Sequence, residues 1–170
     1  MEFQELIRKR YSVRAYDPRP VEEEKLARVL EAARLAPTAC NLQPFRIVVL
    51  PTKGRETELR RIYGREWFVQ APLVLAVCAL PEESWKRKYD RWNAAEVDAT
   101  IALDHLILAA TDEGLGTCWI AAFDPQAARE VLELPPGIIP VAFTPLGYPA
   151  DSLPPKKRRP VADLVRRDRW

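Results

Sequence analysis

The stretch from residue 94 to residue 110 constrains the fold more than any other part of the sequence. Between its alanines it carries the large apolar side chains Val97, Ile101, Leu103, Leu106, Ile107 and Leu108. Few polar positions remain, and a helix that is apolar nearly all round has to be buried on more than one side. In a chain of 170 residues, we therefore expect this helix either at the centre of the core or at a subunit interface.

Helical and extended patterns alternate along the rest of the chain. Apolar spacing predicts helices over residues 2–10, 56–63, 127–132 and 162–167, and one more between Pro20 and Pro37. Short apolar runs predict strands over residues 47–50, 73–80, 117–122 and 138–144. The first two runs do not alternate with polar residues, which is typical of strands covered on both faces. Because strands and helices intermix, we expect an α/β or α+β sandwich with helices on a sheet.

Length and hydropathy predict one ordinary globular domain. At roughly 150 residues per domain, residues 1–170 make a single domain, and the prolines of residues 150–170 predict an extended tail. No apolar run reaches the roughly 18 residues of a membrane span, and Met1 is followed by a charged segment without a signal-peptide pattern. We therefore expect neither export nor a membrane partner.

Charge and cysteine content narrow the class of function. Twenty-six basic and 24 acidic residues give a net charge of +2, so the chain lacks the strong positive field of nucleic-acid-binding proteins. Any anion site must be local. Cys40, Cys78 and Cys118 are spaced too widely for a metal-binding pair, and their odd number does not fit a disulfide framework. Reduced thiols in a cytoplasmic protein are the simplest interpretation.

Two polar clusters precede the first predicted strand. Arg10, Ser12 and Arg14 combine two guanidinium forks with a hydroxyl donor, a set that suits a phosphorylated planar ligand. A solvated basic loop explains the same residues. Asn41 and Gln43 lie in a proline-bounded turn, where their amides either bind the edge of a heterocycle or only satisfy the turn's own backbone. Spacing alone leaves both alternatives open.

Two further clusters lie in the second half of the chain. Gly114 and Gly116 allow close backbone approach, but the full G-x-G-x-x-G spacing of a dinucleotide-binding fold is missing. Residues 156–160 (KKRRP) are typical of a solvated tail or a nucleic-acid patch, or of side chains that close over a phosphate. Cys118 has no evident base and is interpreted as a buried structural thiol. The single histidine, His105, is interpreted as a satisfied core residue, so neither a triad nor a zinc site is expected.

Taken in order, these clusters resemble the FMN-dependent nitroreductase family, in a short form. Residues 10–14 (RYSVR) are similar to the family's R-x-S-x-R signature, and residues 31–44 to its E-A-A-R-x-A-P-S/T-x-x-N-x-Q-P block. Residues 114–120 are similar to the G-L-G-x-x-W-I block, and residues 146–158 to the L-G-Y-P and K-x-R elements. The resemblance spans most of the chain, and four blocks in order are far more specific than any one of them.

The resemblance implies an α+β nitroreductase-like fold, with a mostly antiparallel central sheet flanked by helices. It also implies an interleaved homodimer that binds two FMN molecules at its interface. The residues that it assigns to FMN are Arg10, Tyr11, Ser12, Arg14, Pro37, Thr38, Ala39, Asn41, Gln43, Ala121, Ala122, Lys156 and Arg158. No side chain is assigned as a catalytic acid or base, and no metal is implied.

Each assigned group has a different implied contact with FMN. Arg10 and Ser12, with Lys156 and Arg158 from the tail, bind the phosphate, and Arg14 reaches the pyrimidine edge of the ring near N1 and O2. The residues of the turn, 37–43, come from the partner subunit against the ribityl chain and ring. Backbone N–H groups near Ala121 and Ala122 lie under the ring and can donate to N5.

The implied reaction is a ping-pong hydride transfer. NADH or NADPH reduces the flavin, and a small-molecule electron acceptor such as a nitroaromatic or a quinone is then reduced in the same pocket. The same fold also hosts dehydrogenating, dehalogenating and flavin-fragmenting enzymes, which remain alternatives. A protein that binds nucleic acid through its basic tail is the alternative from another class, and the low net charge argues against it.

Overall fold

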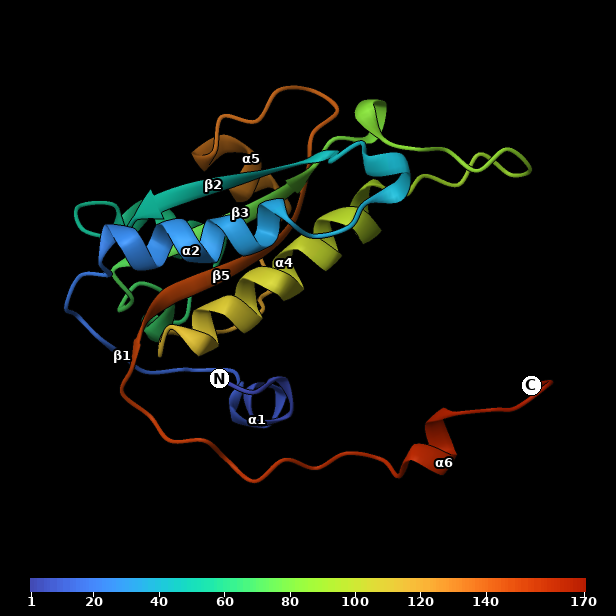
Figure 1. The fold of residues 1–170 in the computed structure, drawn as a ribbon. Helices are drawn as coiled ribbons and strands as arrows, with labels where there is room; N and C mark the ends of the chain where they lie inside the picture. The colour runs from blue at the N-terminus through green and yellow to red at the C-terminus, as the bar shows by residue number, and fades with distance from the viewer.

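The strand with the most apolar sequence lies at the centre of the sheet. β3 (Leu73–Ala79) pairs with β2 (Phe45–Pro51) on one side and with β5 (Ile139–Pro149) on the other. The short strands β1 (Tyr16–Asp17) and β4 (Gly116–Thr117) both pair with β5. All these pairs are antiparallel, which confirms the predicted α+β fold with an antiparallel central sheet. The computed structural model describes residues 1–170 without a gap (Figure 1).

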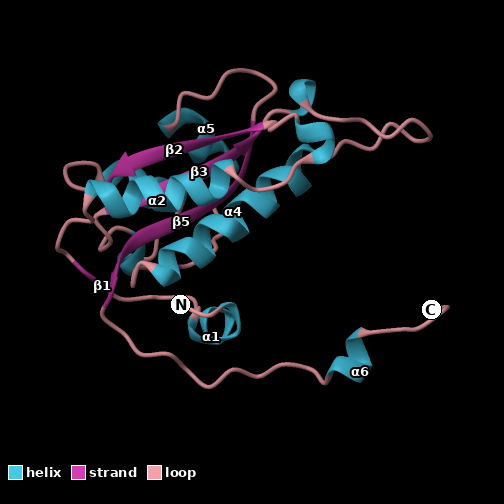
Figure 2. Cartoon of the chain, viewed as in Figure 1, coloured by secondary structure: helices cyan, strands magenta, loops and turns pink.

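Helices cover both faces of this sheet (Figure 2). They are α1 (Phe3–Lys9), α2 (Glu23–Arg34), α3 (Glu56–Ile62), α4 (Ala95–Asp112), α5 (Pro125–Val131) and α6 (Val161–Leu164), with 3-10 turns η1 (Ala39–Asn41), η2 (Glu66–Phe68) and η3 (Pro81–Glu83). Side chains of β3 alternate between the faces. Leu75 and Val77 pack with α2 and α4, whereas Val74 and Ala76 pack with α3 and α5. The result is a three-layer sandwich, and β3 is covered on both faces as predicted.

The helix α4 lies in the core, as its composition predicts. Leu103 and Leu106 have no exposed surface and pack against α2 and the sheet. The opposite side of the helix is only partly covered, because Val97 is 46% exposed and Ile101 and Leu108 are half-buried. An apolar stripe on α4 is therefore left without full cover inside one chain.

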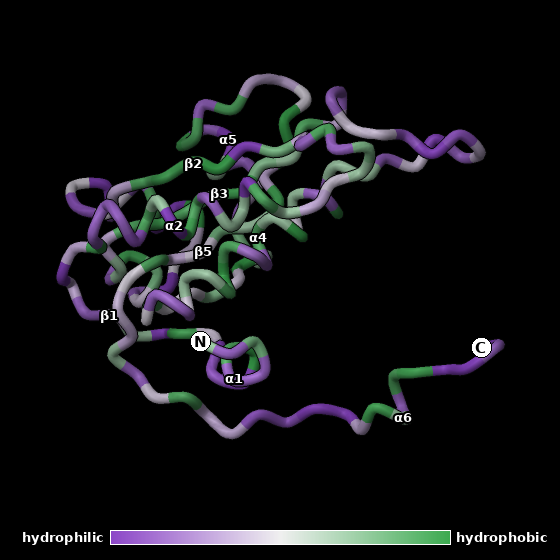
Figure 3. The backbone as a smooth tube through the Cα atoms, viewed as in Figure 1, coloured by the Kyte–Doolittle hydropathy of each residue, from purple (hydrophilic) through white to green (hydrophobic).

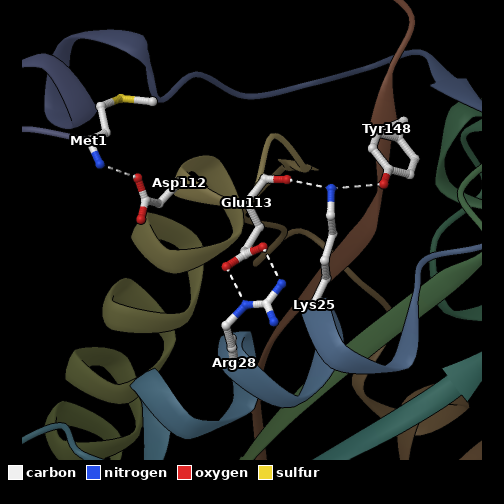
Figure 4. A network of polar contacts seen from close by, with 6 residues as sticks. All are labelled: Met1, Lys25, Arg28, Asp112, Glu113 and Tyr148. Carbon is white, nitrogen blue, oxygen red and sulfur yellow. Dashed lines mark hydrogen bonds and ion pairs between the residues drawn. The ribbon is translucent and has the colours of Figure 1, made fainter.

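A polar network ties α2 to the ends of α4 and β5 (Figure 4). The ammonium group of Lys25 donates to the backbone oxygen of Glu113 and to the hydroxyl of Tyr148, at 2.9 Å each. Arg28 binds both carboxylate oxygens of Glu113, at 2.6 and 2.8 Å. The Tyr148 hydroxyl in turn donates to Glu22 at 2.6 Å. These contacts fix the helical layer relative to the strand that leads into the tail.

Three observed strands differ from the predicted ones. The predicted strand over residues 117–122 is wrong, because only Gly116 and Thr117 pair as β4 and a single bridge then joins Ile120 to Phe143. The predicted strand 47–50 is β2, which is longer and lies at the edge of the sheet. Its side chains pack against helices on both faces as predicted, Ile47 and Val49 on the α2–α4 side and Val48 and Leu50 on the α3–α5 side, although most of them stay partly exposed. The predicted strand 138–144 continues to Pro149, since β5 pairs in turn with β3, β4 and β1.

The tail after β5 leaves the sheet and runs extended past α1 (Figures 1 and 3). Its helix, α6, is shorter than the predicted 162–167. Val161 and Leu164 in α6 are 74% and 64% exposed, so most of their apolar surface is uncovered within the chain. No helix in the structure combines the length and apolarity that crossing a membrane requires.

Candidate functional site

The end of α1 and the start of the tail enclose a cleft of about 190 Å³. Its lining residues are Arg10, Tyr11, Ser12, Arg14, Pro154, Pro155, Lys156, Lys157 and Arg158. The structure therefore brings together, from opposite ends of the chain, the cations that the sequence assigns to a phosphate. The ammonium group of Lys156 donates to the backbone oxygens of Ile7, at 2.9 Å, and of Arg8. These bonds hold the tail against the end of α1.

The cations of this cleft have no anionic partner. Arg10, Arg14, Lys156 and Arg158 form none of the ion pairs in the structure. Partial desolvation, with the nearby charges of Arg10 and Arg158, lowers the pKa of Lys156 below its ordinary value. Positive charges held close together repel one another, and a bound anion would reduce that repulsion. Guanidinium and ammonium groups of this kind can bind a phosphate.

A close backbone approach positions Ser12 in the cleft. Ser12 forms a bridge with Thr117, and the backbone N–H of Val13 donates to the oxygen of Thr117 at 2.9 Å. Gly116 permits this approach, because a Cβ at that position would lie 2.6 Å from Cγ2 of Val13. Gly116, the second glycine of the G-L-G segment, is therefore needed because it leaves room for Val13.

Asp151, a residue outside the sequence motifs, fixes the arginine segment. Its carboxylate accepts hydrogen bonds from the Tyr11 hydroxyl, at 3.0 Å, and from the backbone N–H of Arg14, at 2.8 Å. Burial, and then this hydrogen bond, raise the pKa of Tyr11 from about 10 to about 12, so the phenol remains a hydrogen-bond donor to Asp151 well into the alkaline range. Only the pairing of β1 with β5, continued by the 2.8 Å bond from Ala150 N–H to the oxygen of Ala15, could have indicated this contact.

A second cleft, of about 160 Å³, adjoins the first. It shares Arg10, Tyr11 and Ser12 with the first cleft and adds Asp104, Ile107, Thr117 and Trp119. Shortly after Trp119, Ala121 and Ala122 are exposed, and their backbone N–H groups make no hydrogen bond within the chain. Such free donors can bind a polar ring edge, which is the role that the resemblance assigns to them. Asp104, an exposed carboxylate on α4, was not predicted.

The turn over residues 37–43 has an unusual backbone. Cys40, Asn41 and Gln43 have positive φ angles of 52°, 55° and 48°. Non-glycine residues adopt this left-handed region at a cost, so the surrounding contacts must hold them there. The backbone N–H of Gln43 donates to the Thr38 hydroxyl at 3.1 Å, and its side-chain amide donates to Asn41. The turn is thus braced by its own polar side chains.

Asp98 anchors this turn to α4 and was also not predicted. Its side chain is buried at 3% exposure, and Oδ1 accepts a hydrogen bond from the backbone N–H of Ala39 at 3.0 Å. Its other oxygen, Oδ2, has no partner. Burying an unpaired carboxylate oxygen is costly. The contact that holds the turn on α4 therefore carries a desolvation cost at Asp98 itself.

Within one chain, the turn and the cation cluster lie apart. The turn packs on α4 at Asp98, whereas the second cleft reaches α4 at Asp104, about 9 Å further along the helix at 1.5 Å per residue. Figure 1 shows the cyan turn and the dark-blue α1 at different ends of the molecule. One chain therefore does not bring all the assigned residues together.

Other candidate sites in the chain are weaker. Cys118 is 4% exposed and burial raises the pKa of its thiol, in line with a structural role. His105 lies half-buried on the outer face of α4 without a hydrogen bond, so the prediction of a satisfied core histidine is wrong. A larger groove of about 610 Å³ contains none of the assigned residues; Pro18, Lys53 and Gln70 are among those that line it.

Comparison with known proteins identifies the family. The model of the Nitroreductase family matches residues 7–66 and 55–148. The FMN reductase (NAD(P)H) of Bacillus subtilis strain 168 is 34% identical over 165 residues, which cover 88% of this chain and 66% of that relative. The NADH dehydrogenase of Thermus thermophilus is 33% identical, over 92% of this chain and 91% of its own length. The chain thus spans just under two thirds of the first relative and most of the second.

Solved structures agree with the sequence match. A nitroreductase family protein from Clostridium difficile 630 superposes with a TM-score of 0.92 and 35% identity, over 100% of both chains. The family match also includes the arginine segment, the strained turn and the glycine segment described above. The chain belongs to the nitroreductase family.

Proposed function

We propose that this protein is an FMN-dependent oxidoreductase that takes electrons from NADH or NADPH, with residues 1–170 as one FMN-binding domain. The names of its relatives support an oxidoreductase, since one is an FMN reductase (NAD(P)H) and another is an NADH dehydrogenase. The observation that carries the proposal is the cleft where Arg10, Ser12 and Lys156 meet without an anion of the chain's own.

The donor set in this cleft fits the phosphate of FMN. A phosphomonoester carries nearly two negative charges at neutral pH, and Arg10, Lys156 and Arg158 supply positive charge without a competing carboxylate. Ser12 adds a hydroxyl. The one nearby carboxylate, Asp151, is already engaged with Tyr11 and a backbone N–H. Phosphate binding would therefore offset the repulsion from Arg10 and Arg158, which adds to the effect of desolvation in lowering the pKa of Lys156.

Other residues are available for the ring. The guanidinium of Arg14 is exposed and donates only to the backbone oxygen of Ser12, at 3.3 Å. It is free to approach the pyrimidine edge, where a cation favours added negative charge. The unpaired N–H groups of Ala121 and Ala122 are the donors that we assign to N5.

The chain's own contribution to the reaction is binding and electrostatics. When bound, FMN supplies the redox chemistry, a ping-pong hydride transfer from the nicotinamide to a second substrate. We assign no side chain as a catalytic acid or base, because hydride transfer to and from a flavin does not require one. We propose a nitroaromatic, a quinone or a similar small molecule as the electron acceptor. Dehydrogenation, dehalogenation and flavin fragmentation are the alternatives on the same fold.

We further propose that the site is completed in a homodimer. The turn over residues 37–43 lies away from the cation cluster of its own chain, so it is available to the flavin held by the partner. The apolar stripe on α4 that contains Val97 offers a surface for that partner. Each FMN would then contact Arg10 of one chain and Asn41 of the other.

The visible absorption spectrum of the purified protein tests the proposal. We expect yellow protein with about one FMN per chain, bleached under anaerobic conditions by NADH or NADPH and restored by a quinone or a nitroaromatic. Apoprotein reloaded with riboflavin, which lacks the phosphate, should bind at least ten-fold more weakly than apoprotein reloaded with FMN. Colourless protein that fails to bind added FMN would remove the proposal.

A further inference from the structure

Between η3 and α4 the chain leaves the body of the molecule as a narrow hairpin, residues 84–94 (Figure 1, yellow-green). Lys86 and Asn93 form an antiparallel bridge across it, and the backbone N–H of Arg87 donates to the oxygen of Trp92 at 2.8 Å. The hairpin is therefore ordered by its own backbone. It nevertheless presents aromatic rings to solvent, because Tyr89 is 93% exposed and Trp92 is 43% exposed.

The hairpin also concentrates positive charge. Residues 84–94 contain four basic side chains and one acidic side chain, and their net charge of +3 exceeds that of the whole chain. Two of the cations are neutralised, since Arg87 pairs with Asp90 at 2.6 Å and Lys86 pairs with Glu82 at 3.4 Å. Lys88 and Arg91 form no ion pair. Two free cations thus lie within two residues of Tyr89 in the sequence.

The base of the hairpin is fixed to the strained turn of the proposed flavin site. The backbone N–H of Leu80 donates to the oxygen of Pro44 at 2.8 Å. The Asn93 side chain donates to the oxygen of Pro81 at 2.8 Å and accepts from the backbone N–H of Ala95 at 2.9 Å. Through Asp98, the same end of α4 holds the turn itself. Turn, hairpin and helix start therefore form one corner of the molecule.

We infer, on the basis of the proposed function, that this hairpin binds the adenosine half of the reductant and favours NADPH over NADH. A purine can stack on the exposed ring of Tyr89. The free cations of Lys88 and Arg91 match the phosphates, above all the 2′-phosphate that distinguishes NADPH. Each arm of about four residues extends roughly 13 Å at 3.3 Å per residue. The hairpin can thus contact the end of the coenzyme remote from the nicotinamide.

A charge-neutralising variant tests the inference on the FMN-loaded protein. Lys88→Gln with Arg91→Asn removes both free cations, and asparagine tolerates the positive φ of 61° at position 91. The matched control is Lys53→Gln with Arg65→Gln, which removes two exposed, unpaired cations outside the hairpin. We expect the hairpin variant to bind 2′,5′-ADP about ten-fold more weakly by calorimetry, and the control to stay within two-fold of wild type.

Flavin reduction by three reductants completes the test. For the hairpin variant, the half-saturating concentration should rise about ten-fold for NADPH, less for NADH and not at all for reduced nicotinamide mononucleotide, which lacks the adenosine half. Equal losses in the control, an unchanged value for NADPH, or an equal rise for the mononucleotide would overturn the inference. A wild-type flavin that none of the three reduces would overturn the proposed function, while 2′,5′-ADP binding would still report on the hairpin.

Discussion

Arg10 and Arg14 belong to one short segment, yet their surroundings differ. Arg10 lines both clefts and its charge contributes to the lowered pKa of Lys156. Arg14 lines only the first cleft, with its backbone held by Asp151 and its guanidinium exposed. The two arginines should therefore affect the flavin in different ways, one through the phosphate and the other through the ring.

Substituting the two arginines separates these roles. Arg10→Ala removes a contact that is the same in both redox states, so FMN affinity should fall by about 1.5 to 3 kcal/mol with little change in midpoint potential. Arg14→Ala removes a cation that favours the reduced, more negative ring, so the midpoint potential should fall. A loss of about 2 kcal/mol in that preference is roughly 40 mV for a two-electron couple. Redox titration of both variants in excess FMN compares them, and equal shifts would contradict the assignment.

At the level of residues, the sequence shows which charged side chains belong to the candidate site, but not which hydrogen-bond partners hold them in place. The grouping of Arg10 and Ser12 with Lys156 is implied by the resemblance to the nitroreductase family, because residue types and spacing alone left each cluster open. Asp151 and Asp98 could not be found in that way, because each acts through a backbone N–H whose position depends on tertiary structure. One needs the β1–β5 register, and the other needs the packing of the turn on α4.

At the level of elements, the contact between β4 and the arginine segment depends on a glycine, Gly116, because any larger residue would meet Val13. Gly116→Ala would place a methyl group 2.6 Å from Val13, so we expect a loss of about 1 to 3 kcal/mol in the free energy of unfolding. Gly64→Ala is the matched control, because its Cβ would meet nothing closer than 3.9 Å. Urea denaturation measures both variants.

A second substitution distinguishes overlap from a general loss of stability. If the methyl group destabilises by meeting Val13, then Val13→Ala should offset part of the loss, and the double-mutant cycle should give a favourable coupling of about 0.5 kcal/mol or more. Additive effects of Gly116→Ala and Val13→Ala would show that the close approach is not the cause.

The strands show where sequence patterns fail at this scale. β5 contains Pro140, Pro145 and Pro149, and prolines usually mark strand ends, so its continuation past residue 144 could not be predicted. An apolar run indicates that both faces of a strand are covered, but it does not reveal whether the strand has a neighbour on each side, so the edge position of β2 could not be predicted. The helices other than α6 were predicted closely, because a period near 3.6 residues is set by the face that a helix packs against its neighbours. α6 packs no face, and it is shorter than predicted.

At the level of the whole molecule, one chain leaves apolar surface uncovered and keeps the turn over residues 37–43 away from the cation cluster. The composition of residues 94–110 predicts that α4 is covered on more than one side, and the structure covers only part of it. Val97, Ile101 and Leu108 remain at least partly exposed on α4, as do Val161 and Leu164 on α6. Burial of such surface is the main driving force for association, so assembly and flavin binding should be linked.

Val97→Glu tests this link, because the residue is 46% exposed on the outer face of α4 and its replacement need not disturb the core. In a two-fold interface the new charge would be buried in both chains. We expect sedimentation to show a dimer for wild type and for Val97→Ile, and a folded monomer for Val97→Glu at micromolar concentration. The monomer should also lose FMN although its cation cluster is intact, because the turn of the partner is missing. A wild-type monomer, or a Val97→Glu monomer that retains FMN with wild-type affinity, would show that one chain forms the whole site.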